Sequence, residues 1–334
     1  MAELTYRDAV VAALAQEMAR DPRVVLIGED LGAGGVFKTT KGLFDRFGPT
    51  RVRDTPISEQ AIVGAAMGAA MAGLRPVAEI MFSDFFATCW DGVVNGIAKA
   101  RYMTGGQVSV PLVIRSANGG GIGFGSQHSQ AVENWAMCVP GLKIVAPATP
   151  ADMIGLLAAA IRDDDPVLVF EHKALYGTRG LCPDGEHHVP LGTAAVRREG
   201  SDVTFVALAA TVATCLQAAD HLAGEGISAE VIDLRSLVPL DARAVLGSVA
   251  RTGRLVVVEE NPGQLGWGAA IAALVAEEAF GDLRGPVMRV SGGNVPLPVA
   301  KDMEAEVSVS AARAAGAARA ALGFTGQPVA RSSS

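Results

Sequence analysis

Short apolar runs alternate with helical patterns along most of this chain, and this alternation constrains the fold more than any other feature. Strands are predicted at residues 24–28, 76–81, 110–115, 143–146, 166–171, 203–208, 229–233 and 254–259. Helices are predicted at residues 5–19, 58–72, 84–103, 150–161, 212–222, 268–279 and 308–322. Such an order is typical of mostly parallel sheets covered by helices, so we expect an α/β fold.

The length of 334 residues is enough for two domains that each bury a core. The alternation breaks where Gly, Pro, Asp and paired His follow one another. We therefore predict a first domain of residues 1–180, a linker of residues 181–200 and a second domain of residues 201–325. The polar segment 326–334 is expected to be a flexible tail.

Charge and composition argue against several classes of partner. The net charge is −7 and Lys and Arg form no cluster, so nucleic acid is not expected as a partner. The most apolar run, residues 61–73, is too short to span a bilayer, and the N-terminus lacks the pattern of a signal peptide. The four cysteines are scattered without a C-x-x-C pair, so we predict a reducing cytoplasm with neither zinc nor disulfides.

The segment DTPISE, residues 54–59, ends on a carboxylate at the start of a small-residue helix. In one interpretation Ser58 caps this helix and Glu59 simply suits its first turn. In the other, Glu59 lies against the nearly uncharged surface of that helix and shares a proton with a ligand nitrogen. Burial and the helix terminus shift the pKa of Glu59 in opposite directions, so the sequence leaves the net shift open.

Gly64, Gly68 and Ala72 recur at four-residue spacing on this helix and give it a smooth face. Such a face suits tight packing inside the domain, and it equally suits close contact between helices of two subunits. The sequence leaves both interpretations open.

Two further segments combine residue types that bind ligands. Aromatic residues cluster directly after a predicted strand, where Phe85 or Phe86 belongs to the core or stacks on a flat heterocycle. The loop of residues 118–130 is rich in glycine but has no complete G-x-G-x-x-G, so a dinucleotide fingerprint is rejected. Its glycines indicate a mobile or closely approached backbone. His128 stands there among polar neighbours, which makes it a candidate functional residue.

Asp163, Asp164 and Asp165 follow the helix predicted at residues 150–161. Carboxylates have the wrong sign for a helix C-terminus, whose dipole favours cations. A solvated turn before Pro166 is one interpretation, and an oxygen-rich seat for a hard cation is the other.

Taken together, these segments are far more specific than any one of them. The order DTPISE, GLRPVAEIMFSDF, RYMTGG, SQHSQ, PGLKIV and AIRDDDPVLVFEHK resembles the beta subunit of thiamin-diphosphate-dependent 2-oxo acid dehydrogenases, including those for pyruvate, branched-chain substrates and acetoin. The resemblance continues through VIDLRSLVPLD and VVVEENPGQLGWGA. It implies a thiamin pyrimidine-binding parallel-sheet domain followed by a transketolase C-terminal-like domain.

The resemblance also implies roles for individual residues. Glu59 corresponds to the family's cofactor-activating glutamate, which hydrogen-bonds a ring nitrogen of the aminopyrimidine, and Phe85 to the aromatic residue that stacks on that ring. His128 corresponds to the active-site histidine implicated in reductive transfer to the lipoyl group. The remaining implied cofactor-site residues are Ile57 and Met81, which line the pyrimidine, and Glu29 and Asp91, which belong to a proton path between two cofactor sites. The implied ligands of a structural potassium ion are Leu112, Ala160, Ile161, Asp163 and Asp165.

Two positions depart from the family pattern. Gly92 stands where members often have Gln, and Asp165 stands where pyruvate-type chains often have Asn. The first departure affects part of the expected site wall.

Phe324 lies where some members contact the acyltransferase core.

One absence bears on partners. Thiamin enzymes of this kind hold the diphosphate and magnesium with a Gly-Asp-Gly segment, and this sequence contains none. The resemblance therefore implies an alpha subunit that brings the diphosphate and magnesium half, in a heterotetramer of two alpha and two beta chains. A lipoyl-bearing acyltransferase core is the further partner.

The main hypothesis is oxidative decarboxylation of a pyruvate-type 2-oxo acid, or cleavage of acetoin, with acyl transfer to lipoamide. RYMTGG and AIRDDDPVLVFEHK favour pyruvate or acetoin over branched-chain substrates. One alternative is the pyrimidine-binding half of a split transketolase-like ketol transferase. Another is a non-catalytic interaction subunit.

Overall fold

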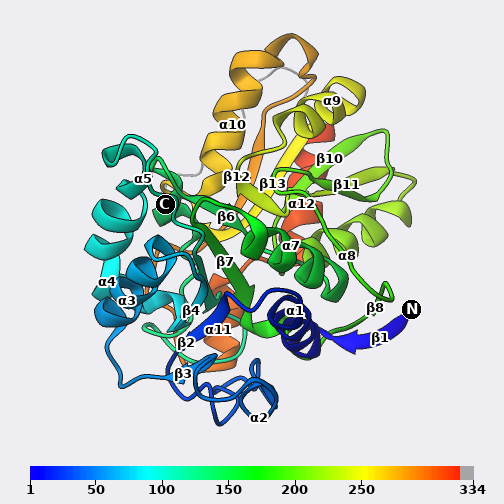
Figure 1. Ribbon diagram of the computed structural model, residues 1–334. Helices are drawn as coiled ribbons and strands as arrows, with labels where there is room; N and C mark the ends of the chain where they lie inside the picture. Colours follow the sequence, from blue (N-terminus) through cyan, green and yellow to red (C-terminus); the bar gives the residue numbers. More distant parts are fainter. Residues whose placement is uncertain (324–334) are drawn as a thin grey trace.

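Two largely parallel sheets organise the chain in the computed structural model, which describes residues 1–323 (Figure 1). The first sheet has the order β12-β6-β7-β5-β4-β2-β3 and is parallel except for β12. The second has the order β14-β13-β10-β11-β9 and is parallel except for β9. The expected two-domain α/β class is confirmed.

The strands of the first sheet are β2 (Val24–Gly28), β3 (Val52–Asp54), β4 (Arg75–Phe82), β5 (Val113–Asn118), β6 (Lys143–Val145), β7 (Val167–His172) and β12 (Ser236–Val238). Those of the second are β9 (Ala195–Arg198), β10 (Val203–Ala207), β11 (Ala229–Asp233), β13 (Leu255–Pro262) and β14 (Met288–Gly292). A separate antiparallel pair joins β1 (Ala2–Thr5) to β8 (Arg179–Cys182).

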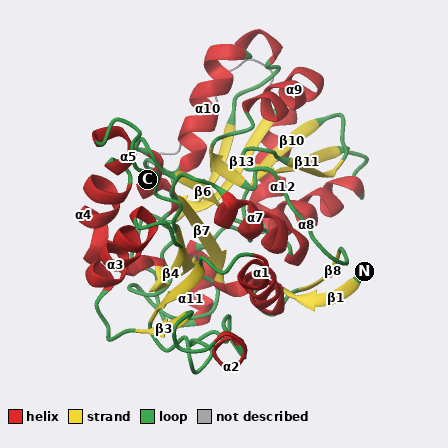
Figure 2. Ribbon diagram, viewed as in Figure 1, coloured by secondary structure: helices red, strands yellow, loops and turns green. Residues whose placement is uncertain are grey.

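The helices cover the outer faces of these sheets, as Figure 2 shows. In the first half they are α1 (Tyr6–Arg20), α2 (Leu43–Phe47), α3 (Glu59–Met71), α4 (Phe86–Asp91), α5 (Ala100–Met103), α6 (Glu133–Met137) and α7 (Pro150–Arg162). In the second half they are α8 (Thr211–Ala223), α9 (Ala242–Thr252), α10 (Trp267–Glu278), α11 (Lys301–Val307) and α12 (Ala311–Leu322).

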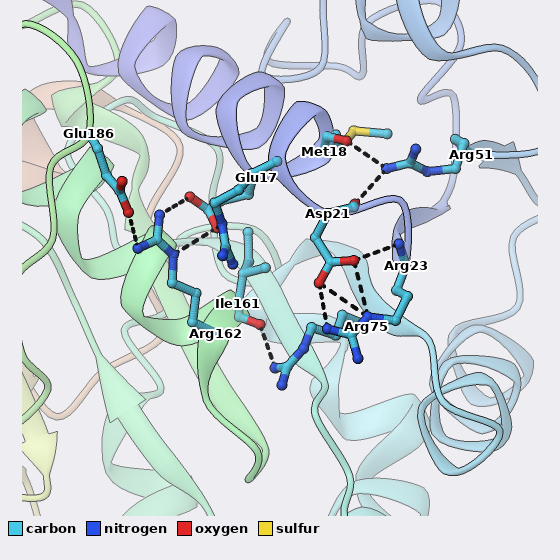
Figure 3. Close-up of polar contacts among 10 residues, drawn as sticks. Glu17, Met18, Asp21, Arg23, Arg51, Arg75, Ile161, Arg162 and Glu186 are labelled. Atoms are coloured by element: carbon cyan, nitrogen blue, oxygen red, sulfur yellow. Dashed lines mark hydrogen bonds and ion pairs between the residues drawn. The ribbon is translucent and has the colours of Figure 1, made fainter.

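Successive side chains of a strand point to opposite faces of the sheet, and in the first sheet the side chains on both faces are buried. In β2, Val24 and Leu26 pack with α1 and α7, whereas Val25 and Ile27 pack with α3 and α4. A bidentate ion pair also joins the two helices of the first face, since Arg162 donates from Nη2 and Nε to the two Glu17 oxygens at 2.6 and 2.9 Å (Figure 3). Strands buried on both faces explain the nearly continuous apolar runs in the sequence.

The two halves of the chain share one core. The cluster that covers the α3 side of the first sheet extends to Ile232 and Val257 of the second sheet and to Trp267 of α10. The edge strand β12 lies in sequence among the elements of the second sheet but pairs antiparallel with β6 of the first. The second sheet packs its other face against α8 and α12.

Several sequence predictions about local structure are confirmed. Thr5 is the N-cap of α1, and its hydroxyl accepts a hydrogen bond from the Asp8 N–H at 3.1 Å. Strands β2 and β11 have the predicted bounds. Ser58 occupies the N-cap position of α3, but its side chain makes no capping hydrogen bond.

The single helix predicted at residues 84–103 is wrong. The segment divides into a 3₁₀ turn at Ser83–Phe85, α4, a π-helical stretch at Gly92–Ile97, and α5, and Cys89 has non-helical angles. Gly92 lies so close to α3 that a Cβ there would be 3.1 Å from Val63 Cγ2. Glycine also lowers helix propensity, so the periodic pattern does not produce a regular helix.

Strands lie in or beside the segment that we expected to be a linker. β8 overlaps its start and pairs with the N-terminal β1, and β9 lies near its end as the antiparallel edge of the second sheet. Short edge strands of this kind carry no clear alternation of apolar residues.

None of the helices within residues 1–323 has the length and apolarity that crossing a membrane requires.

Candidate functional site

The predicted site residues gather at one edge of the first sheet. β7, β5, β4, β2 and β3 are parallel neighbours, so the residues that follow them meet at the carboxyl edge, where α/β folds place ligands. Glu29 follows β2, Phe85 follows β4, and Glu59 begins the helix after β3. The glycine-rich loop with His128 follows β5.

Two carboxylates form the acidic part of this edge. Glu59 is half-buried at the first position of α3, and Glu29 is nearly buried at 9% exposure. Burial raises the pKa of Glu29, and the nearby charge of Glu59 raises it further. Within residues 1–323 neither carboxylate takes part in an ion pair or a side-chain hydrogen bond. These are therefore carboxyl groups with free acceptor capacity, beside an Ile57 side chain that is 81% exposed.

An aromatic cluster forms the second part. The His128 ring lies edge-on to Phe82 and Phe85, with ring centroids 4.6 and 5.2 Å apart and interplanar angles of 79° and 81°. Phe86 is instead 1% exposed and packs in the core, so of the two candidates Phe85 is the one beside His128. Phe85 also lines a cavity of about 330 Å³ together with Asp84, Gln127 and Gln130.

The glycine-rich loop is closely approached by other segments, which decides between the two interpretations of its glycines. Gly119, Gly121, Gly123 and Gly125 all have positive φ, a conformation that other residues rarely adopt. A Cβ at Gly125 would lie 2.8 Å from Val299 Cγ2, and one at Gly119 would overlap the His172 ring. The loop therefore needs glycine for both its backbone angles and its packing.

Two residues of this edge escaped sequence reasoning. His172 ends β7, and its Nε2 lies 2.5 Å from Glu260 Oε2 of the second half of the chain. Lys173 follows it and is 3% exposed. Its ammonium has no hydrogen-bond partner within residues 1–323 and lies 5.6 Å from the Phe82 ring centre. Burial lowers the pKa of Lys173 to about 8. Their position directly after a predicted strand was the available signal.

A larger cavity of about 760 Å³ lies behind the loop, between the two halves of the chain. Ser129 and Trp135 line it from the first half, and Glu260, Leu265 and Leu297 from the second. Among the described residues, Glu260 is the only ionisable side chain in its lining, and the carboxylate is already paired with His172.

Three of the five residues in the implied potassium site, Ile161, Asp163 and Asp165, have oxygens that already pair with Arg or Lys side chains. Arg75 Nη1 donates to the carbonyls of Ile161 and Asp163 at 3.0 and 2.9 Å, and Figure 3 shows its guanidinium beside the Ile161 carbonyl. Lys143 Nζ lies 2.8 Å from Asp163 and 3.2 Å from Asp165, which also pairs with Arg101. A potassium ion at this set would therefore have to share these oxygens with Arg75, Lys143 and Arg101, and the site stays a prediction.

The other two members of the set make backbone bonds. The carbonyls of Leu112 and Ala160 accept from Val167 and Asp163 at 2.9 and 3.3 Å. No group of three or more His, Cys, Asp or Glu side chains within residues 1–323 is arranged to hold a metal ion. The acids after α7 are thus paired with side-chain cations, which accounts for their unfavourable position at a helix end.

The remaining predicted residues lie apart from this centre or at its margin. Met81 is partly buried near the end of β4. Asp91 is exposed on α4, and its Oδ1 accepts from Asn95 Nδ2 at 2.7 Å. No hydrogen bond or ion pair within the described chain joins Asp91 to Glu29.

The smooth face of α3 is open. Gly64, Gly68 and Ala72 are exposed, and a Cβ at either glycine would meet nothing within 4 Å. Packing of this face inside the domain is therefore wrong, and contact with another subunit stays a prediction.

Comparison with known proteins places both halves in one superfamily. The family described as the transketolase pyrimidine binding domain matches residues 2–179, and the transketolase C-terminal domain matches residues 192–313. Among solved structures, one titled split gene transketolase, inactive beta4 tetramer, is similar with a TM-score of 0.79 and 27% identity, over 96% of this chain and 98% of that one.

Curated relatives are more similar in sequence. The chain is 48% identical to pyruvate dehydrogenase E1 component subunit beta-2 of Oryza sativa subsp. japonica, over 90% of this chain and 82% of the relative. It is 46% identical to the acetoin:2,6-dichlorophenolindophenol oxidoreductase subunit beta of Cupriavidus necator, over 95% and 97%. It is 44% identical to the 2-oxoisovalerate dehydrogenase subunit beta of Bacillus subtilis, over 91% and 94%.

Proposed function

Because this chain belongs to the family of beta subunits of thiamin-diphosphate-dependent 2-oxo acid and acetoin dehydrogenases, we propose that it forms the decarboxylating component of a pyruvate-type or acetoin dehydrogenase complex. The reaction is oxidative decarboxylation of a small 2-oxo acid, or cleavage of acetoin, with acyl transfer to lipoamide. The observation that carries the proposal is the carboxylate of Glu59, which has no cation partner within the described residues and stands at the edge where Phe85 and His128 meet.

The residues at this edge fit the aminopyrimidine half of thiamin diphosphate. Glu59 is half-buried with free acceptor capacity, as a partner for a ring nitrogen requires. Phe85 presents an aromatic ring for stacking, and Ile57 and Met81 supply apolar surface. When bound, the cofactor supplies an electron sink for bond cleavage beside the substrate carbonyl, and the protein orients it.

Glu29 and His128 have supporting roles in the proposal. Burial and the charge of Glu59 raise the pKa of Glu29, so this carboxyl holds a proton more readily than an exposed one. Glu29 therefore belongs to the proposed proton path, whereas Asp91 lies on the exposed side of α4. His128 is held edge-on by two phenylalanines and is the proposed donor to the lipoyl group.

We infer that an alpha subunit completes the site. The sequence has no Gly-Asp-Gly, so magnesium and the diphosphate are assigned to that partner, and the open face of α3 offers a surface for a subunit contact. The heterotetramer of two alpha and two beta chains, and docking to a lipoyl-bearing acyltransferase core, belong to the same proposal. Phe324, the position expected to contact that core, and the expected tail 326–334 lie outside the described residues.

The cytoplasm is the proposed compartment. Cys89, Cys138, Cys182 and Cys215 are all free, three of them buried. Unpaired cysteines support the proposed reducing cytoplasm.

A split transketolase is the second candidate, because a structure with that title matches nearly the whole chain. The identity of 27% is well below the 44–48% shared with dehydrogenase subunits. The cavity behind the loop also lacks the basic side chains that a sugar phosphate would need.

The test is co-expression with the alpha chain. The purified pair is assayed with pyruvate, acetoin and 2-oxoisovalerate, using an artificial electron acceptor, and with sugar phosphates. We expect thiamin-dependent turnover of pyruvate or acetoin by the pair and none by the beta chain alone. Turnover of sugar phosphates alone would support the transferase and contradict the proposal. Cofactor binding unchanged by Glu59→Ala and Phe85→Ala would indicate a non-catalytic subunit.

A further inference from the structure

A carboxylate from the second half of the chain holds the glycine-rich loop. Glu304, on α11, is 2% exposed. Its Oε1 accepts from the Gly121 N–H at 2.8 Å, and its Oε2 accepts from the Gly123 N–H at 2.9 Å. Figure 1 shows α11 beside the first sheet although it comes late in the sequence. Backbone N–H groups bound to an ionised carboxylate make stronger hydrogen bonds than neutral pairs.

Within residues 1–323 the acceptor for the N–H groups of Gly121 and Gly123 is the Glu304 carboxylate. Gly121 and Gly123 have φ of +88° and +76°, outside any regular helix or strand. A Cβ at Gly120 would come within 3.0 Å of Glu304 Oε1, so the carboxylate fits directly against the loop. Gly121 is exposed and Gly123 half-buried, so removing the carboxylate would leave both N–H groups to water and release this stretch of the loop from α11.

His128 belongs to the same loop. The His128 N–H donates to the Gly125 carbonyl at 3.2 Å, and the ring then contacts Phe82 and Phe85. Between Gly125 and His128, the Ser126 hydroxyl donates to the Leu297 carbonyl at 3.0 Å. Glu304 is therefore linked to His128 through the loop backbone, which runs from Gly123 to Gly125, and through the hydrogen bond between the Gly125 carbonyl and the His128 N–H.

We propose that Glu304 is a positioning residue that sets the place of His128 through the glycine-rich loop. This inference rests on the proposed function, in which His128 serves transfer to the lipoyl group. Within residues 1–323 the hydrogen bonds of the Glu304 carboxylate go to backbone N–H groups of the loop, so in this proposal it acts through His128 and not on the substrate. The second half of the chain thereby controls the acyl-transfer step while Glu59, at another point of the edge, controls the cofactor.

The experiment compares two acceptors on the reconstituted alpha–beta pair. In Glu304→Ala, transfer to lipoamide is expected to slow by ~100-fold, as a small misplacement of a reacting group does. Turnover with an artificial acceptor, which bypasses His128, is expected to change little. Glu304→Gln keeps one acceptor oxygen and is expected to lie between wild type and Glu304→Ala. Equal loss with both acceptors would overturn the proposal in favour of general loosening of the fold.

A double-variant cycle isolates the route through His128. If Glu304 acts only by placing His128, Glu304→Ala adds no further loss to His128→Ala in the lipoamide assay. Independent, multiplying losses would overturn the proposal. Glu306→Gln, an exposed residue of the same helix, is the matched control and is expected to behave as wild type.

Hydrogen exchange of the loop separates this inference from the proposed function. In Glu304→Ala, the amides of residues 119–128 are expected to exchange about tenfold faster or more, while those of β5 are unchanged. Unchanged hydrogen exchange of the loop amides would overturn the proposal that Glu304 holds the loop, whatever the activity of the variant. If the wild-type pair shows no turnover with either acceptor, the proposed function fails. Faster exchange of the loop amides in Glu304→Ala would still support the proposal that Glu304 holds the loop.

Discussion

Two groups of charged side chains belong to the same parallel sheet, one inside it and one at the ends of its strands, and they differ in whether their charges are compensated. Inside the sheet, Arg115 donates from Nε and Nη2 to Glu171 at 2.6 and 2.9 Å, and from Nη1 to Glu79. At the strand ends, Glu29 pairs with no cation and Lys173 with no anion within residues 1–323. The first arrangement serves the fold, and the second leaves charges for a cofactor or partner subunit to meet.

The pKa shifts follow the same division. Burial alone would lower the pKa of Arg115, but Glu171 and Glu79 outweigh it and raise that pKa. Burial lowers the pKa of Lys173 to about 8, and more distant carboxylates only partly offset this. A buried group with an oppositely charged partner beside it stays ionised. Without such a partner, the pKa of the group shifts toward neutral pH.

The largest expected effect comes from breaking the compensated group. Arg115→Leu leaves two buried carboxylates without a cation and should lower the free energy of unfolding by ~3–5 kcal/mol. Urea unfolding of the beta chain measures it. Arg243→Leu, at an exposed position, is the control and should stay within ~0.5 kcal/mol of wild type. A loss as small as the control's would show that the network contributes little.

Removing the uncompensated cation should have the opposite sign. Because the folded pKa of Lys173, about 8, lies below the ordinary 10.5, ionised Lys173 destabilises the fold below pH 8. Lys173→Met should therefore raise the free energy of unfolding by ~3 kcal/mol at pH 7. The gain should fade as pH rises from 8 to 10.5. Destabilisation by this substitution at pH 7 would mean that the ammonium has a compensating partner.

A smaller change within the network removes one hydrogen bond. The Tyr176 hydroxyl donates to Glu171 Oε2 at 2.9 Å in the core. Tyr176→Phe should cost ~1.5–3 kcal/mol, the usual range for a bond to a charged acceptor. Thermal unfolding of the isolated chain is sufficient, and an unchanged melting temperature would contradict the assigned bond.

The smallest expected effect is at Glu29. Its pKa is raised in the folded chain, so its ionisation weakens the fold as pH rises from the ordinary carboxyl pKa through the folded one. Glu29→Gln should stabilise the chain slightly at pH 7 and leave it unchanged at acidic pH, where both states are protonated. Equal effects at both pH values would exclude ionisation as the cause.

Much of this arrangement could be predicted from local patterns. The strands β2 and β11, the cap of α1, and the positions of Glu59 and Phe85 after strands all follow from short-range signals in the sequence. The pairing of Glu79 with Arg115 could not be, because it depends on the register of β4 against β5. The order and register of strands are set when the whole sheet assembles, so a local sequence pattern does not reveal them.

Contacts between distant segments were likewise beyond prediction. Glu304 meets Gly121 across 183 positions, and His172 meets Glu260 across 88. The broken helix at residues 84–103 has the same cause, since the close approach of α3 at Gly92 overrides a periodic pattern. In each case the deciding partner comes from another element.

The central claim is that Glu59 is reserved for the cofactor, and one variant tests it most directly. Glu59→Gln keeps the size of the side chain and removes its charge. In the alpha–beta pair we expect turnover of pyruvate or acetoin to fall by ~10²–10⁴-fold, as for loss of a proton-transfer group. The free energy of unfolding of the beta chain should change by less than ~0.5 kcal/mol, because Glu59 has no partner within the described residues. Near-normal turnover would contradict the account.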